Sequence, residues 1–162
     1  MVKKIRSFIE LNHSRKPVDE GDIFVCSPQQ GEFIWGRVIK GNGIKVFAGN
    51  EILVYFYNVI TTSSNIIPSL DKNNLLIPPQ FVIKQYWSSG DFETIEKRSL
   101  KNEEILNVHC FYDGLYKKYV NEFGQDLDKK YEPCGTYGFP SAMLIAKRLK
   151  EALAKNQTDE NT

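Results

Sequence analysis

The sequence predicts a mostly β fold of the β-rich α+β class. It is expected to form an antiparallel, strongly bent or barrel-like sheet with one C-terminal amphipathic helix. Short apolar runs alternate with Gly-, Pro- and Asn-containing turns along most of the chain. The 162 residues include 10 Phe and 8 Tyr, which favour strands. This length suits one domain, expected over 1–156, with a flexible tail at 157–162.

The first expected element is a hairpin in GDIFVCSPQQGEFIWGRVIKG, residues 21–41. Two apolar runs within 22–39 flank the turn SPQQG, where Pro and Gly interrupt a strand. Phe24 and Trp35 are predicted to be buried. A glycine in the middle of a strand marks a bulge or a close backbone approach, so Gly36 should lie at such a point.

The next strong prediction is a central strand over 52–60, ILVYFYNVI, because this run is apolar on both faces. Its consecutive Tyr55, Phe56 and Tyr57 must point to both sides of the sheet. The other expected strands have weaker sequence patterns and span 44–48, 75–77, 81–87, 92–96 and 105–112. The strand at 75–77 should end at Pro78-Pro79. A hairpin at 117–127 and an irregular segment at 131–140 are expected to follow.

The two ends of the chain differ in their periodicity. Apolar and charged residues alternate over 5–11, which suits a strand. The segment SAMLIAKRLKEALAKN instead has apolar residues at helical spacing, so a helix is predicted over about 141–155 with Ser141 as its N-cap. Its expected core-facing residues are Ile145, Leu149 and Leu153.

The charge balance limits the function classes. Lys and Arg number 21 against 20 Asp and Glu, a formal net charge of +1, which does not indicate a nucleic-acid binder. No segment approaches the roughly 20 apolar residues of a membrane span, and none resembles a signal peptide. The three cysteines, Cys26, Cys110 and Cys134, lack CxxC spacing, so neither a disulfide framework nor a zinc site is expected. We expect Cys26 to be a core residue. We also expect the protein to be cytoplasmic, with its cysteines reduced.

The sequence contains no signature of catalysis. It lacks the GxSxG, P-loop, dinucleotide-binding and HExxH patterns. His109 and Cys110 are neighbours in an apolar run, but neighbours in a strand point to opposite faces and cannot form a nucleophile pair. The acidic pair Glu103-Glu104 lies in a polar region where charge is usually solvated. No catalytic residue, metal or cofactor is therefore expected.

The opening stretch resembles the N-terminal signature of the bacterial immunity protein 26 family. That signature is a Gly-Asp-[Ile/Val]-Phe strand, a short polar turn and an aromatic-rich strand ending in Gly-Arg-Val. Three later pieces are also similar: ILVYFYN, LLIPPQFVIKQYWSSGDFETI, and YVNEFGQDL followed by a Gly-containing segment and a final helix. The resemblance covers roughly 18–153. The extension 1–17 lies outside the core pattern and should be an extra strand or an arm.

The resemblance implies a non-enzymatic protein that binds and neutralises a cognate toxin of a bacterial polymorphic toxin system, encoded by a neighbouring gene. The alternatives are a small β-barrel adaptor or nucleic-acid-binding module, or an enzyme with an unrecognised site. The family motifs look structural and transfer no contact residues. Partner contacts are instead expected from aromatic and charged groups near loops and strand ends. The residues chosen on this basis are Tyr86, Trp87, Asp91, Glu103 and Glu104.

Overall fold

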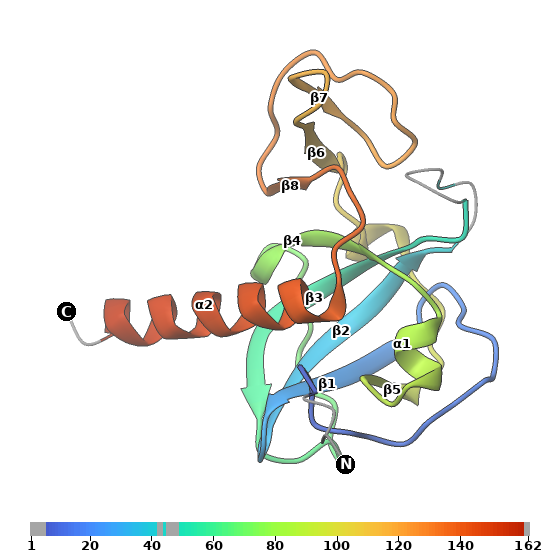
Figure 1. Cartoon of the computed structure of the whole chain (residues 1–162), viewed down its shortest axis with the longest axis vertical. Helices are drawn as coiled ribbons and strands as arrows, with labels where there is room; N and C mark the ends of the chain where they lie inside the picture. Colours follow the sequence, from blue (N-terminus) through green and yellow to red (C-terminus); the bar gives the residue numbers. More distant parts are fainter. Residues whose placement is uncertain (1–5, 42–43, 45–48, 161–162) are drawn as a thin grey trace, which may run out of the picture.

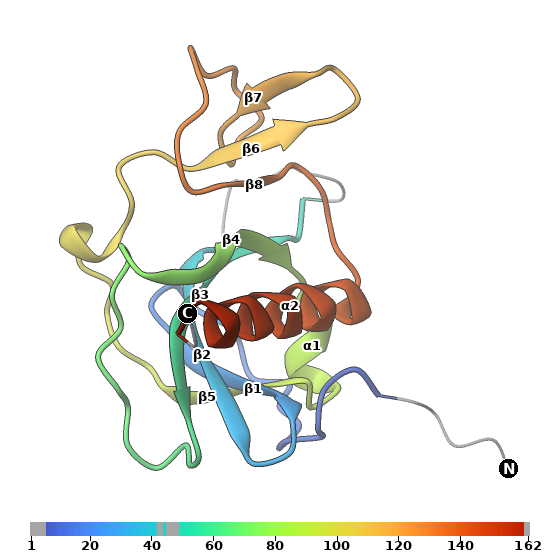
Figure 2. The same cartoon turned by 90° about the vertical axis from the view of Figure 1, so that its left-hand side faces the viewer.

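The computed structural model describes residues 6–41, 44 and 49–160. Its larger sheet has five strands in the order β4-β3-β2-β1-β5, and every neighbouring pair is antiparallel. The strands are β1 (Ile23–Gln29), β2 (Glu32–Lys40), β3 (Ile52–Thr61), β4 (Leu75–Val82) and β5 (Phe92–Glu96). The sheet is bent but open, with β4 and β5 at its edges, and it curls around the helices (Figure 2). The predicted fold class is confirmed.

The first hairpin is confirmed as the pairing of β1 with β2. Phe24 and Trp35 are both fully buried. The ladder between β2 and β3 is irregular between Ile34 and Gly36, and a Cβ placed on Gly36 would lie 2.4 Å from Cζ of Phe24. The backbone at Gly36 therefore passes directly beneath the Phe24 ring, as the mid-strand glycine predicted.

The strand β3 is buried on both faces from Ile52 to Tyr57, as its apolar run predicted, whereas its last four residues are exposed or half-buried. Val54 and Phe56 face a cluster that also contains the helices. Tyr55 and Tyr57 face a second cluster, which also contains Phe111. The alternation of side chains along a strand thus lets one segment join two separate hydrophobic layers.

The C-terminal helix α2 (Ala142–Glu160) lies across the first cluster. The hydroxyl of Ser141 accepts a hydrogen bond from the backbone N–H of Leu144 at 3.1 Å, so Ser141 caps the helix as expected. Ile145 and Leu149 are fully buried, and Leu153 is partly buried against the same cluster. The helix extends past the expected end near residue 155, because no Gly or Pro stops it.

Two expectations around β4 were wrong. The strand does not end at Pro78-Pro79 but continues to Val82. Because β4 is an edge strand of the five-stranded sheet, a missing proline N–H costs little there. The expected strand over 81–87 stops at Val82, and Gln85–Ser88 form the short helix α1. Both α1 aromatics, Tyr86 and Trp87, turn into the core.

A second, three-stranded sheet stands on the other side of β4 (Figure 1). Its order is β7-β6-β8, with β6 (Cys110–Asp113) antiparallel to β7 (Lys118–Val120) and parallel to β8 (Cys134–Thr136). The expected strand over 105–112 is therefore short. The expected hairpin at 117–127 forms as a short one that turns at Gly124. It is held by the bridge between Val120 and Asp126 and by the backbone N–H of Leu127, which donates to Tyr119 at 2.9 Å. The segment 131–140, expected to be irregular, contains β8.

The N-terminal residues 6–20 run as an extended arm that belongs to no sheet. Phe8 is buried and packs edge-on against Phe92 at 5.6 Å between ring centroids. The backbone N–H of Ile9 donates to Ser27 and that of Leu11 to Gly90, so the arm is tied to the domain. The expected strand at 5–11 is not formed in its described part, and the extension is an arm, the other form expected for it. The expected strand at 44–48 lies largely outside the described residues.

Candidate functional site

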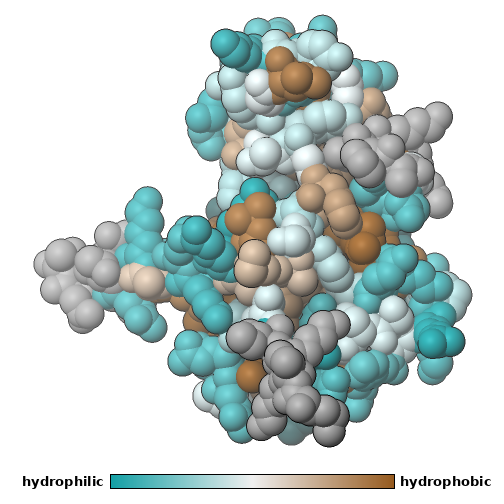
Figure 3. All heavy atoms as spheres, viewed as in Figure 1, coloured by the Kyte–Doolittle hydropathy of each residue, from teal (hydrophilic) through white to brown (hydrophobic). Residues whose placement is uncertain are grey.

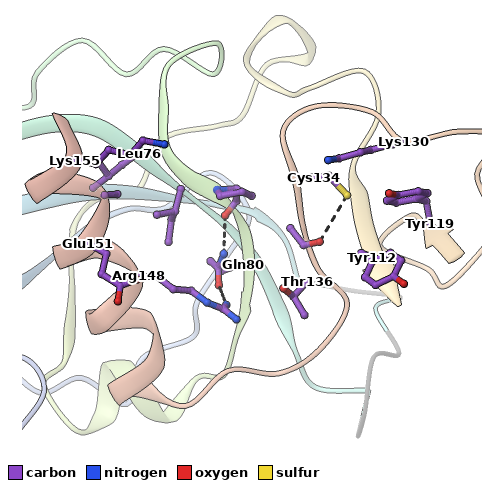
Figure 4. Close-up of a pocket in the computed structure, with 14 residues that line it drawn as sticks. Leu76, Gln80, Tyr112, Tyr119, Lys130, Cys134, Thr136, Arg148, Glu151 and Lys155 are labelled. Carbon is purple, nitrogen blue, oxygen red and sulfur yellow. Dashed lines mark hydrogen bonds between the residues drawn. The ribbon is translucent and has the colours of Figure 1, made fainter. Parts of the chain in front are cut away.

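An open cleft of about 800 Å³ lies between the small sheet, β4 and α2. In Figure 4 side chains converge on it from all three elements: Gln80 from β4, Arg148 from α2, and Tyr112 and Tyr119 from the small sheet. The small sheet stands away from α2 (Figure 1), and the cleft lies between them, lined on the helix side by Arg148, Glu151 and Lys155. We call it the α2 cleft.

A buried amide and a guanidinium form the floor of the α2 cleft. Gln80 is almost fully buried; its Nε2 donates to the carbonyl of Pro78 at 2.8 Å and its Oε1 accepts from Arg148 at 2.5 Å. Burial lowers the pKa of the Arg148 guanidinium, which nevertheless stays charged at neutral pH. Gln80 thus orients Arg148, whose remaining N–H groups can donate to a ligand.

The charged groups that line the α2 cleft are mainly cationic. They are Lys130, Arg148 and Lys155 against the single carboxylate of Glu151. Lys130 also pairs at 3.0 Å with Glu132, which is not part of the cleft lining. A site with this excess of cations over carboxylates favours an acidic ligand.

The far wall of the α2 cleft is aromatic. Tyr112 and Tyr119 are directly paired across β6 and β7, and their ring centroids are 5.4 Å apart. Beyond them, the turn between these strands exposes Leu115 and Tyr116 to 81% and 70%. Figure 3 shows hydrophobic surface at this end of the molecule. Rigid aromatic rings beside cationic groups are typical of protein–protein contact surfaces.

A buried polar cluster joins the small sheet to β3. The hydroxyl of Tyr55 lies 2.6 Å from Nε2 of His109 and accepts from the backbone N–H of Leu106 at 3.0 Å. The other ring nitrogen of His109 contacts the carboxylate of Glu122. Burial opposes ionisation of Glu122, but the hydrogen bond and charge of His109 outweigh it and lower its pKa. His109 is therefore a hydrogen-bonded core histidine that fastens the two sheets together.

The buried guanidinium of Arg37 holds a strand-free loop against the larger sheet. It donates to the carbonyls of Gly21, Arg98 and Ser99 at 3.1–3.2 Å, and it pairs with Glu104. Burial opposes ionisation of Glu104, yet hydrogen bonds from the Lys101 backbone and from Arg37 lower its pKa. Glu104 has thus a partner within the chain.

The five residues expected to contact a partner lie away from the α2 cleft. Tyr86 and Trp87 belong to the core, where the Tyr86 hydroxyl donates to Pro140 at 2.9 Å and the Trp87 indole to Thr94 at 3.1 Å. Asp91 accepts from Arg6 at 2.9 Å. Glu103 is exposed in the short 3₁₀ helix η1 (Asn102–Glu104), next to the Arg37-bound Glu104. That they contact a partner stays a prediction.

Sequence reasoning missed the α2 cleft for a physical reason. Its walls come from segments far apart in the chain, and the parallel pairing of β6 with β8 leaves no local pattern. The amphipathic helix carried the one usable signal, because Lys147, Arg148 and Lys150 in its sequence lie off the apolar face formed by Ile145, Leu149 and Leu153. Nothing showed that a second sheet would face part of that surface.

The fold and the cleft define a β-rich domain with an open, cationic and aromatic surface site. A family model described as immunity protein 26 matches residues 19–121, well over half of the chain. The chain belongs to the immunity protein 26 family. The match includes β1 to β7, whereas the β8 and α2 sides of the cleft lie beyond it. No curated protein and no solved structure matches the chain.

Among residues 6–41, 44 and 49–160, no group of His, Cys, Asp and Glu side chains is arranged to hold a metal ion. Within the same ranges, no helix combines the length and apolar character that crossing a membrane would require.

Proposed function

We propose that this protein is an immunity protein that binds and neutralises a cognate toxin domain of a bacterial polymorphic toxin system. It would act in the cytoplasm of the producing cell, without turnover. The single observation that carries the proposal is the family match over residues 19–121. Immunity proteins are in general not enzymes, which agrees with a sequence that lacks catalytic signatures.

The α2 cleft is the surface that suits this function best. We propose that it receives an acidic segment of the toxin, whose carboxylates would bind Arg148 and Lys155. Three cations against one carboxylate in the lining support this choice of occupant. Arg148 is already held by Gln80, so little side-chain entropy is lost when it binds. Tyr112 and Tyr119 would supply the apolar contact area.

The function is tested by expressing the product of the neighbouring toxin gene in a sensitive host, with and without this protein. The expected results are survival only with the protein, and a 1:1 complex of the purified partners. Protection by far less than one equivalent would contradict stoichiometric binding. Failure to bind the neighbouring gene product would favour the adaptor or nucleic-acid-binding alternative.

The docking surface is tested separately with charge reversals on α2. Lys155→Glu reverses a charge in the cleft, whereas Lys147→Glu reverses an exposed charge on the same helix outside the cleft. We expect Lys155→Glu to weaken the complex several-fold, mainly through slower association, and the weakening to diminish at high salt. Equal effects of both variants would exclude the cleft as the docking surface while leaving the toxin-binding function intact.

A further inference from the structure

We infer that Cys110 and Cys134 form a reversible disulfide that ties β6 to β8 at the wall of the α2 cleft. The two residues are directly opposite each other in the parallel ladder. Their Sγ atoms are 2.9 Å apart, and both are free thiols. A disulfide has an S–S distance of about 2.05 Å, so the bond would form by an approach of under about 1 Å.

The two thiols differ in accessibility, which sets the order of the reaction. Cys110 is fully buried, whereas Cys134 is partly exposed and lines the α2 cleft. An oxidant therefore reaches Cys134 from the cleft. The buried Cys110 is the resolving thiol, which attacks the oxidised Cys134 in the second step. The third cysteine, Cys26, is fully buried in the core cluster with α2 and serves as an internal control.

The reaction requires a disulfide oxidant, such as oxidised glutathione. The Cys134 thiolate attacks one glutathione sulfur, forms a mixed disulfide and releases one glutathione thiolate. Cys110, after losing its own proton, attacks Sγ of Cys134 and releases the second glutathione thiolate. The protein loses two electrons and two protons, and one glutathione disulfide becomes two thiols. The open cleft of about 800 Å³ gives the oxidant access to Cys134.

The thiolate that starts the reaction is scarce at neutral pH. Burial, and then the neighbouring Cys110 thiol, raise the pKa of Cys134 to about 12. Only the thiolate is nucleophilic, so the rate of oxidation should rise nearly tenfold for each pH unit between pH 7 and pH 9. The dithiol would thus tolerate brief exposure to an oxidant and respond to sustained exposure.

The bond would close a chain segment of 24 residues in sequence separation. That segment contains the hairpin β6–β7 and also Tyr119 and Lys130, which line the cleft. Closing it restricts the unfolded chain, so we expect the melting temperature to rise by about 5–12 °C. The inference does not depend on the toxin-binding proposal and can be tested on the purified protein alone.

The experiment incubates the full-length protein with oxidised glutathione at pH 8.5 and counts free thiols. We expect one free thiol, assigned to Cys26 by peptide mapping, a mass lower by two hydrogen atoms, and the higher melting temperature. Dithiothreitol should reverse all three changes. In Cys110→Ser the same treatment should stop at a glutathione adduct on Cys134, whereas Cys26→Ser should still form the bond.

Three outcomes would overturn the inference. They are an unmodified protein at equilibrium, a stable glutathione adduct on Cys134 in the wild type, and a bond between two copies of the chain. The Cys26→Ser comparison guards against misassignment, because a bond that includes Cys26 would disappear in that variant. Should Cys110→Ser fail to fold, the intact mass and peptide map of the wild type still decide between these outcomes.

Discussion

Substitution of Gly36 by alanine tests the packing of the core most directly. The added Cβ would lie 2.4 Å from Cζ of Phe24 and 2.8 Å from its two Cε atoms. Ordinary contact therefore requires a shift of about 1 Å, since carbon atoms pack at roughly 3.5 Å. The ring cannot move freely, because Phe92, Trp87 and Phe56 surround it at centroid distances of 4.9, 5.1 and 5.7 Å. Overpacking of this kind costs about 1–3 kcal/mol.

The expected loss for Gly36→Ala is about 2 kcal/mol, because alanine also loses less conformational entropy in a strand and recovers part of the cost. Urea unfolding measures it, with the buried Trp35 and Trp87 as fluorescent probes. Gly41→Ala is the matched control, since its Cβ would meet no atom of the described residues within 4 Å. Combining Gly36→Ala with Phe24→Leu should cost less than the two single losses together. An unchanged or raised midpoint for Gly36→Ala would refute this packing argument.

Three further substitutions test other parts of the structure. Leu149→Asp would bury an unpaired charge in the core cluster under α2, so loss of the far-ultraviolet circular dichroism signal at 25 °C is expected; a cooperative native-like melt would contradict it. The pKa of Glu122 is lower in the folded protein than in the unfolded chain. The stability that this carboxylate contributes is therefore complete above the unfolded-state pKa and is lost as the pH falls through the folded-state pKa. Glu122→Gln should thus flatten the acid side of a curve of stability against pH. Equal curves would show that its contact with His109 contributes nothing. Arg37→Met should cost about 3–5 kcal/mol in chemical denaturation, because the carbonyls and Glu104 that it binds lose their buried partner; a loss below about 1 kcal/mol would mean that water replaces the guanidinium.

The larger sheet could be predicted where its pattern was local. The hairpin of β1 and β2 followed from two apolar runs and one turn, and the double-sided burial of β3 followed from consecutive aromatics. The helix α2 followed from its 3.6-residue spacing. In each case the information lay within about 20 residues, the range over which periodicity and turn chemistry act.

The parts that could not be predicted depend on distant partners. Tyr86 and Trp87 are too few residues to distinguish a strand from the single helical turn they form. The expected strand was ended at Pro78-Pro79 because proline is tolerated mainly in an edge strand. That β4 is an edge strand follows from the strand order, which the sequence does not show. The α2 cleft required knowledge of how the small sheet stands relative to α2, which no residue spacing contains.

The strand order also constrains how the chain assembles. β1 to β4 form a meander in which each strand pairs with its neighbour in sequence, whereas β5 must return to pair with β1 across the intervening chain. Loop-closure entropy makes such a return slow compared with forming the hairpins. We expect a folding transition state in which the meander is formed and β5 is still free. Destabilising changes in β5 would then accelerate unfolding and leave the refolding rate nearly unaltered.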